Sequence, residues 1–277
     1  MKSLYTISLA TIACLALSLG ACRKADNYVD NSVAFNRVQY RQAYILIGSA
    51  NDYGHEGDLT YGTEVDMLMP TALYGHDVNT LTDTIMNRTF GKFGEAHLDI
   101  IKESMRAQAA SLEYALADTV LPDSLTANYN FLSCVDGFSA VQGDVETLTP
   151  SVLSIALTIS AYQPAAAHGN YGTLYVNYDL ENGQIIELTD IISSDALPAV
   201  LDRVKDIART MSAVTGPTDI DALPAGDNFY ITASNEIVFS YQPYEVASYA
   251  QGEIQIPVPA CLIATSLTPL GNKLLLN

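Results

Sequence analysis

The sequence predicts an α+β fold: a mainly antiparallel sheet with two principal helices packed on one side. Three observations lead to this class. Two long segments carry apolar residues at every third or fourth position, whereas most other segments alternate with a period of two. The chain runs strands, helix, strands, helix, strands, an order typical of helices on an antiparallel sheet. No unit of 20–50 residues repeats, so a solenoid or propeller is not expected.

The first half is expected to hold two strands followed by helices. Residues 38–47 are rich in β-forming side chains, and residues 59–69 are read as the returning strand after a turn-rich loop at 48–62. Residues 77–90 carry apolar side chains at helical spacing. The first principal helix covers residues 98–116, where the apolar side chains share one face, and Pro122 follows as a helix-ending residue.

The second half is expected to place strands around the second principal helix. That helix covers residues 195–213, with Ser194 or Asp195 as the N-cap and Gly216-Pro217 closing it. Glu181-Asn182-Gly183 predicts a hairpin turn. The segments that alternate as strands do are residues 129–145, 153–161, 171–180, 184–188, 229–232, 236–241 and 253–258.

The N-terminus has the order of a bacterial lipoprotein signal peptide. Met1-Lys2 gives a basic start, Leu4 to Leu19 is apolar but short for a membrane span, and Gly20-Ala21 precedes Cys22. Small residues before a cysteine fit the signal peptidase, and the Cys22 thiol would then receive diacylglycerol. We expect an exported protein, anchored by lipid to the cell envelope. In a Gram-negative cell we expect the outer membrane, since Arg23 is not the Asp that favours inner-membrane retention.

This pattern predicts four segments along the chain. They are a signal peptide at 1–21, a polar tether at 22–34, an N-terminal strand-and-helix half at 35–150 and a C-terminal half at 151–277. Cys14 would leave with the signal, so Cys134 and Cys261 would remain after lipidation of Cys22. In an exported compartment these two could form a disulfide or stay as buried free thiols, and the sequence leaves both open.

Charge is sparse and one-sided. The chain has 13 Lys+Arg against 31 Asp+Glu, a net charge of −18, although only 16% of its residues are charged. Residues 42–87, 107–202 and 210–272 contain no Lys or Arg but hold 25 of the 31 acids. We expect a molecule with an acidic sheet side and a mixed helix side. Its negative field would attract cationic partners; the alternative is that the charge serves solubility alone. A nucleic-acid partner is not expected, because phosphate binding needs a basic patch.

Common catalytic motifs are absent from the sequence. The patterns of nucleotide-binding loops, serine-hydrolase elbows and zinc proteases do not occur. His55, Glu56 and Asp58 share the turn-rich loop, and His76-Asp77 follows, but their spacing matches no standard metal site. No metal and no other cofactor is therefore expected. His97, beside the apolar stripe of the first principal helix, is read as a structural or surface residue.

The C-terminal half carries two separated motifs. The first joins Ala167-His168-Gly169-Asn170, Tyr178-Asp179-Leu180-Glu181-Asn182-Gly183 and Leu188-Thr189-Asp190-Ile191-Ile192. The second joins Asp227-Asn228-Phe229-Tyr230-Ile231 to Gln242-Pro243-Tyr244-Glu245-Val246-Ala247-Ser248-Tyr249-Ala250-Gln251-Gly252. Over residues 150–260 the chain resembles the extracellular domain-of-unknown-function family of the lysozyme-binding anti-sigma factor RsiV. The same family occurs as an accessory domain of the peptidoglycan deacetylase PdaC and in many bacterial lipoproteins.

The resemblance implies a non-enzymatic module that binds lysozyme, another cationic cell-wall-associated protein, or peptidoglycan. Neither signalling nor deacetylation carries over, because the corresponding segments are missing. The residues expected to contact the partner, each with a structural role as the alternative, are His168, Tyr241, Tyr244, Glu245 and Tyr249. Two other classes stay open: an enzyme or accessory domain acting on peptidoglycan or another glycan, with Asp190 and Glu245 as carboxylate pair, and a purely structural envelope lipoprotein.

Overall fold

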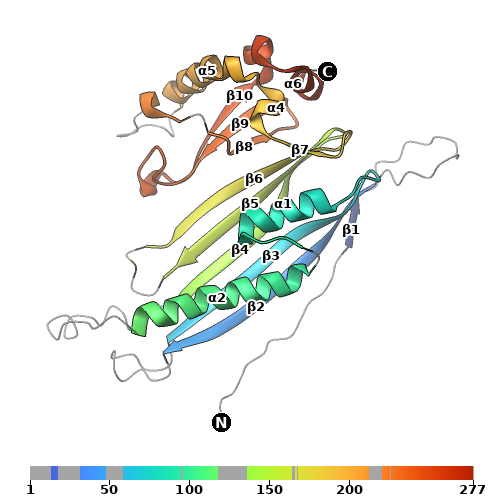
Figure 1. The fold of residues 1–277 in the computed structure, drawn as a ribbon. Helices are drawn as coiled ribbons and strands as arrows, with labels where there is room; N and C mark the ends of the chain where they lie inside the picture. The colour runs from blue at the N-terminus through green and yellow to red at the C-terminus, as the bar shows by residue number, and fades with distance from the viewer. Residues whose placement is uncertain are drawn as a thin grey trace, which may run out of the picture.

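The structure is a computed structural model that describes residues 14–17, 32–47, 59–94, 96–117, 136–163, 166, 168–211, 220–224 and 226–276. The described strands form two sheets, and helices cover one face of each (Figure 1). The α+β class is confirmed, and all strand pairs except β3–β4 are antiparallel.

The larger sheet has seven strands, which lie side by side in chain order. They are β1 (Cys14–Leu17), β2 (Val33–Ile47), β3 (Leu59–Leu73), β4 (Gly137–Leu148), β5 (Val152–Tyr162), β6 (Asn170–Asp179) and β7 (Gln184–Ile186). Helices α1 (Asn79–Phe90) and α2 (His97–Ala117) lie between β3 and β4 in the sequence. This long crossover allows β3 and β4 to pair in parallel, since a tight hairpin cannot join parallel strands.

Helices α1 and α2 pack on one face of the larger sheet (Figure 1). Alternate residues of the strands, such as Val65 and Met67 of β3, turn toward the helices and are fully buried. On the helices, Leu81, Ile85 and Met105 have no exposed surface. The period of two in the strands and the helical spacing therefore meet in one hydrophobic core, as the sequence predicts.

The second sheet lies after β7 and has its own core. Its strands are β8 (Phe229–Ile231), β9 (Glu236–Tyr241) and β10 (Ile254–Pro259), in the order β10-β9-β8. The helices of this part are α4 (Leu188–Ile191), α5 (Leu197–Thr210) and α6 (Pro269–Leu275), and the 3-10 turns are η3 (Ser194–Ala196), η5 (Ile220–Ala222), η6 (Tyr249–Gln251) and η7 (Ala260–Ser266). The structure differs here from the expected single sheet: α2 covers the larger sheet, whereas α5 covers the smaller one. Helical periodicity shows that a helix has an apolar face, but not which sheet that face meets.

Side-chain amides join the two sheets along the free edge of β6. β7 pairs with β6 only from Asn177 to Asp179, so the backbone groups of Thr173 and Tyr175 need other partners. The Asn228 amide accepts from the Tyr175 N–H at 3.0 Å and donates to the Thr173 carbonyl at 2.8 Å. The Gln242 amide bonds the N–H and the carbonyl of Thr173 at 2.7 and 2.8 Å. Two residues of the second sequence motif therefore act as fold-determining residues.

Several expected boundaries can now be compared with the structure. The boundary placed at residue 150 falls in the short connection between β4 and β5, two neighbouring strands of one sheet. β2 begins at Val33, inside the expected tether, and β1 lies inside the expected signal peptide and pairs with β2. Cys22, Cys134 and the loop histidine His55 lie outside the described residues.

The described residues add four facts about the other expected features. Cys261 is a free and exposed thiol. His97 begins α2. No described helix combines the length and the apolar content needed to cross a membrane, and no three His, Cys, Asp or Glu side chains of the described residues gather in a way that could hold a metal ion.

Candidate binding site

Three of the five predicted contact residues come together in the structure. His168 precedes β6, while Tyr244 and Tyr249 lie between β9 and β10. The Tyr244 hydroxyl lies 2.9 Å from His168 Nε2, and the His168 ring stacks on Tyr249 with centroids 4.2 Å apart. Tyr171, which is not among the five predicted contact residues, packs edge-on against Tyr249 at 5.8 Å. We call His168, Tyr171, Tyr244 and Tyr249 the aromatic cluster.

Tyr244 occupies an unusual backbone position. Its φ is +70°, in the left-handed region, and its side chain is 61% exposed. A non-glycine residue in that region costs roughly 1–2 kcal/mol. The turn is held by the Glu245 N–H, which donates to the Gln242 carbonyl, and by the Tyr244 N–H, which donates to the Ala247 carbonyl. The chain therefore carries a large exposed ring at a position where glycine would be less strained.

Local hydrogen bonds fix the His168 ring. Its Nδ1 lies 2.8 Å from the Gly169 carbonyl, which can only accept, so Nδ1 carries a proton. In the neutral ring Nε2 is then the acceptor for the Tyr244 hydroxyl. Gly252 leaves room for Tyr171, because a side chain at position 252 would place its Cβ only 2.8 Å from the Tyr171 hydroxyl oxygen. The four rings are thus held in place while part of their surface faces solvent.

The other two predicted contact residues have structural roles. Tyr241 has no exposed surface, and its hydroxyl donates to the Pro224 carbonyl at 3.2 Å. The prediction that Tyr241 contacts a partner is therefore wrong, because β9 turns this side chain toward α5. Glu245 is exposed, but its carboxylate accepts the Gln242 N–H at 2.8 Å and closes the turn that contains Tyr244.

Each of the two carboxylates named in the enzyme alternative forms a hydrogen bond within its own segment. The Asp190 carboxylate accepts the Glu187 N–H at 2.8 Å and caps α4. Glu245 is used in its own turn, and the structure shows no interaction between these two described residues. Asp190 therefore caps a helix, and Glu245 stabilises a turn.

The burial of Tyr241 makes a pH-dependent prediction. Burial, with a smaller effect of Glu245, raises the pKa of Tyr241 to about 12 from an ordinary value of 10.0. The folded state holds this proton more tightly, so the stabilisation is present below pH 10 and is lost as pH rises toward 12. Tyr241→Phe should flatten the fall of the free energy of unfolding over this window by up to about 1.4 kcal/mol per pH unit, measured by urea unfolding. Tyr244→Phe is the control, because it removes an exposed phenol; equal slopes for the wild type and Tyr241→Phe would contradict the prediction.

The face of the larger sheet opposite α1 and α2, which we call the open face, continues from the aromatic cluster. Strand register places one side chain from each strand in a row across it. One row consists of Ala43, Gly62, Phe138 and Tyr162. The next row consists of Arg41, Glu64, Ala140, Ser160 and Tyr171. Tyr171 therefore belongs to both the open face and the aromatic cluster.

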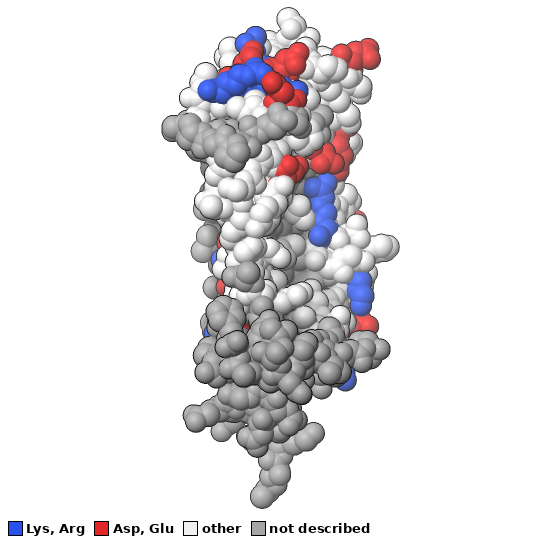
Figure 2. Space-filling view, turned by 90° about the vertical axis from the view of Figure 1, so that its left-hand side faces the viewer, with Lys and Arg blue, Asp and Glu red and all other residues white. Residues whose placement is uncertain are grey.

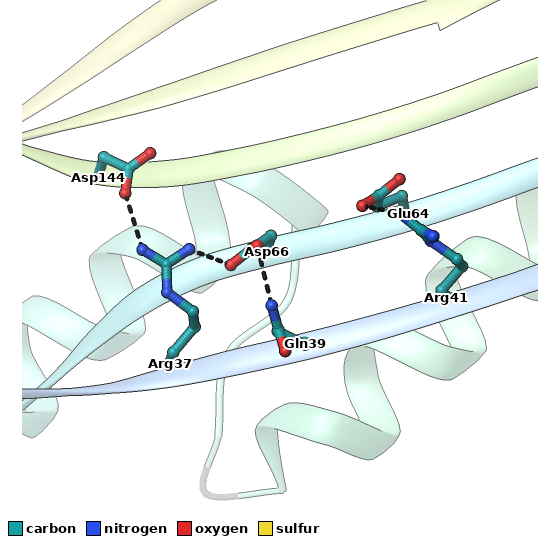
Figure 3. A network of polar contacts seen from close by, with 6 residues as sticks. All are labelled: Arg37, Gln39, Arg41, Glu64, Asp66 and Asp144. Carbon is teal, nitrogen blue, oxygen red and sulfur yellow. Dashed lines mark hydrogen bonds and ion pairs between the residues drawn. The ribbon is translucent and has the colours of Figure 1, made fainter. Parts of the chain in front are cut away.

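Ion pairs hold the charged side chains of this face (Figure 3). Arg37 pairs with Asp66 and, at 3.3 Å, with Asp144, and Gln39 donates to Asp66 at 3.0 Å. Arg41 pairs with Glu64 one row further along. The expected acidic sheet side is therefore found only in part, because two arginines of β2 stand on it beside the acids.

A groove of about 470 Å³ lies on the open face at the row of Gly62. Its lining includes Arg41, Ala43, Glu64 and Phe138, and Phe138 is 45% exposed. Phe138 stacks on Tyr162 with centroids 6.4 Å apart and ring planes 19° apart. Figure 2 views the molecule from the side at which α2 ends and β6 begins; the described surface there is mostly uncharged, and the charges present largely alternate in sign.

Sequence reasoning missed Tyr171, Phe138 and Tyr162. Phe138 lies in β4, Tyr162 in β5 and Tyr171 in β6, and the alternation of side chains along each strand places all three on the open face. Phe138 shares its side of β4 with the polar residues Gln142 and Asp144, which could have indicated an outward ring. Its neighbour on the next strand could not be predicted, because that requires the register between β4 and β5.

Residues 189–260 match a family described as "Protein of unknown function (DUF3298)". This segment runs from α4 to the start of η7 and includes Tyr244 and Tyr249. No curated protein matches the chain in sequence.

Two solved structures share the fold. A DUF3298-family protein from Bacteroides fragilis matches with a TM-score of 0.66 and 20% identity, covering 85% of this chain and 94% of that one. A DUF3298-family protein from Pseudomonas aeruginosa matches with a TM-score of 0.50 and 15% identity, covering 85% and 95%. Both likenesses extend over the larger sheet as well as the matched segment, so this chain shares the fold of two DUF3298-family proteins, and its residues 189–260 match the family in sequence.

Proposed function

We propose that this protein is a lipid-anchored envelope protein that binds a cationic, cell-wall-associated protein through the aromatic cluster, without catalysing a reaction. The observation that carries the proposal is Tyr244. Its ring is 61% exposed, hydrogen-bonded to His168, and held on a left-handed backbone that costs stability. Exposed tyrosines whose rings are fixed in advance are typical anchors of protein interfaces, since little side-chain entropy is lost on binding.

Charge supports a cationic partner. The net charge of −18 creates a field that speeds the encounter with a positively charged protein and weakens as salt rises. The resemblance to the extracellular domain of RsiV adds a specific partner class, because c-type lysozymes are cationic. Contact would then rest on the aromatic cluster, and the acids would contribute mainly to the association rate.

The position of the expected anchor also suits binding. Lipidation at Cys22 would tether the chain at the end of the sheet where β2 begins, at Val33. The row of Ala43 lies ten residues further along β2, or roughly 33 Å away at about 3.3 Å per residue. Tyr162 of this row and Tyr171 of the next lie at the same end of the sheet. The aromatic cluster would therefore lie at the end remote from the anchor.

Tyr244→Gly tests the proposal without damaging the fold. Glycine relieves the left-handed strain, so the free energy of unfolding should stay equal or rise by up to about 1 kcal/mol. The affinity for a c-type lysozyme, measured by biolayer interferometry on the full mature chain, should fall about tenfold or more. A variant that is as stable as the wild type but does not bind would assign Tyr244 to partner contact.

The matched control is Asn235→Gly, which removes another left-handed non-glycine residue from a turn of the same sheet. It should leave lysozyme binding unchanged. Raising the salt from about 50 to about 500 mM should slow association more than it speeds dissociation. If wild-type protein does not bind lysozyme even at low salt, this partner is excluded.

A further inference from the structure

We propose that the groove around Gly62 is a second binding site, specific for a neutral saccharide of a few sugar units. This site goes beyond the proposed function, because it uses the open face of the larger sheet and none of the four residues of the aromatic cluster. Its volume of about 470 Å³ lies in the range of roughly 300–1,000 Å³ that is usual for small-molecule sites.

The groove exists because Gly62 has no side chain. Gly62 lies between Ala43 of β2 and Phe138 of β4 in one row of the open face. Among the described residues, a Cβ at Gly62 would meet only the Gly137 carbonyl oxygen at 3.9 Å and the Phe138 Cβ at 4.0 Å, which are ordinary contacts. As far as the described residues show, the space is therefore open, and neither backbone strain nor crowding from them requires a glycine here. In the middle of a strand, glycine is otherwise an unfavourable choice.

One wall of the groove is a fixed aromatic ring. Phe138 is 45% exposed and stacks on Tyr162 at 6.4 Å. The Tyr162 hydroxyl donates to the Ala166 carbonyl at 3.0 Å, which holds the supporting ring. A pyranose ring presents a face of C–H bonds that packs against such an aromatic surface. The wall is in place before a ligand arrives, which lowers the entropy lost on binding.

Charge determines which ligand fits. The groove contains one cation and one anion, and these pair with each other: Arg41 with Glu64. Their side chains remain 69% and 47% exposed, so both keep hydrogen-bonding capacity toward solvent. A charged ligand would meet no net attraction and would have to break the pair. A neutral ligand with neighbouring hydroxyls can donate to Glu64 and accept from Arg41 while the pair persists.

Gly62→Val tests the site. The valine side chain should occupy the groove. Because β-branched residues are favourable in strands, the variant should still fold. Isothermal titration calorimetry would use the full mature chain and three tetrasaccharides: β-1,4-linked N-acetylglucosamine, β-1,4-linked glucose and α-1,4-linked glucose. The wild type should bind at least one, and Gly62→Val should weaken it about tenfold or more. Preference for the N-acetylated sugar would indicate a cell-wall-type glycan, and preference for either glucan would indicate another source.

Three variants make the test specific. Phe138→Leu keeps an apolar wall but removes the aromatic face, and should also weaken binding about tenfold, whereas Phe138→Tyr should not. Gln142→Val places a β-branched residue on the same face outside the groove lining and should leave binding unchanged. Tyr244→Gly should leave saccharide binding unchanged, so failure of this site and failure of the lysozyme proposal are separate results.

Two outcomes would overturn the saccharide site. One is that no tetrasaccharide binds the wild type at millimolar concentration; the other is that Gly62→Val binds as the wild type does. Loss of lysozyme binding in Gly62→Val, without any saccharide binding in the wild type, would reassign the groove to the protein interface.

Discussion

Replacing Asn228 with Ala should lower the free energy of unfolding by about 2–4 kcal/mol. The Asn228 amide is the partner of the Tyr175 N–H on the free edge of β6, and Tyr175 is 3% exposed. Alanine cannot accept this hydrogen bond. The buried N–H would then be left unpaired, because water does not replace the lost partner at a buried position. The Thr173 carbonyl would lose one of its two amide donors and keep the one from Gln242.

Urea unfolding followed by circular dichroism measures this loss. The matched control is Asp227→Ala, which changes the exposed neighbour on the same chain segment and should shift stability by less than about 0.5 kcal/mol. Hydrogen exchange adds a local readout, since the Tyr175 amide should lose protection first. Equal stabilities of the two variants would mean that the amides do not hold the sheets together.

Replacing Gly271 with Ala should cost about 3 kcal/mol. Gly271 lies in α6, where a Cβ would come within 2.2 Å of the Ile191 carbonyl oxygen and 3.0 Å of the Ile191 carbonyl carbon. Both atoms belong to the backbone of α4, so no side-chain rotation can remove the clash. Alanine gains about 1 kcal/mol in helix propensity, which is less than the expected cost of moving the helix.

Gly62→Ala is the matched control, because within the described part of the chain the same substitution there meets only atoms at 3.9 and 4.0 Å. It should leave the free energy of unfolding within about 0.5 kcal/mol or raise it. The comparison also tests the packing of α6, since Thr268 donates to the Asp190 carbonyl at 2.5 Å in the same contact. A loss of similar size in both variants would contradict the close approach of α4 and α6.

The sequence predicts most elements because their periodicity is strong. The apolar stripe of 98–116 became α2 (His97–Ala117), and the hairpin turn at 181–183 joins β6 and β7. Helix α6 has no long stripe, and only Thr268-Pro269 at its start gives a local signal, through an N-cap followed by proline. The division into two sheets could not be predicted from the sequence, because it depends on which apolar faces meet in space.

The candidate site shows the same limits. Tyr244 and Tyr249 could be selected from their motif, whereas the contact with His168 joins segments 76 residues apart. The burial of Tyr241 could have been predicted, because Ile237, Phe239 and Tyr241 form an alternating series of large apolar or aromatic side chains along β9. The groove depends on Gly62, Phe138 and Tyr162 lying in one row, and register between strands is not encoded in any one strand.

Tyrosine-selective labelling and titration with a c-type lysozyme test the central claim most directly. In aromatic NMR spectra of the full mature chain, the signals of Tyr171, Tyr244 and Tyr249 should shift or broaden saturably, and those of the buried Tyr178 and Tyr241 should not. Such a pattern would place the partner on the aromatic cluster. Saturable binding that moves other tyrosines and leaves these three unchanged would contradict the account.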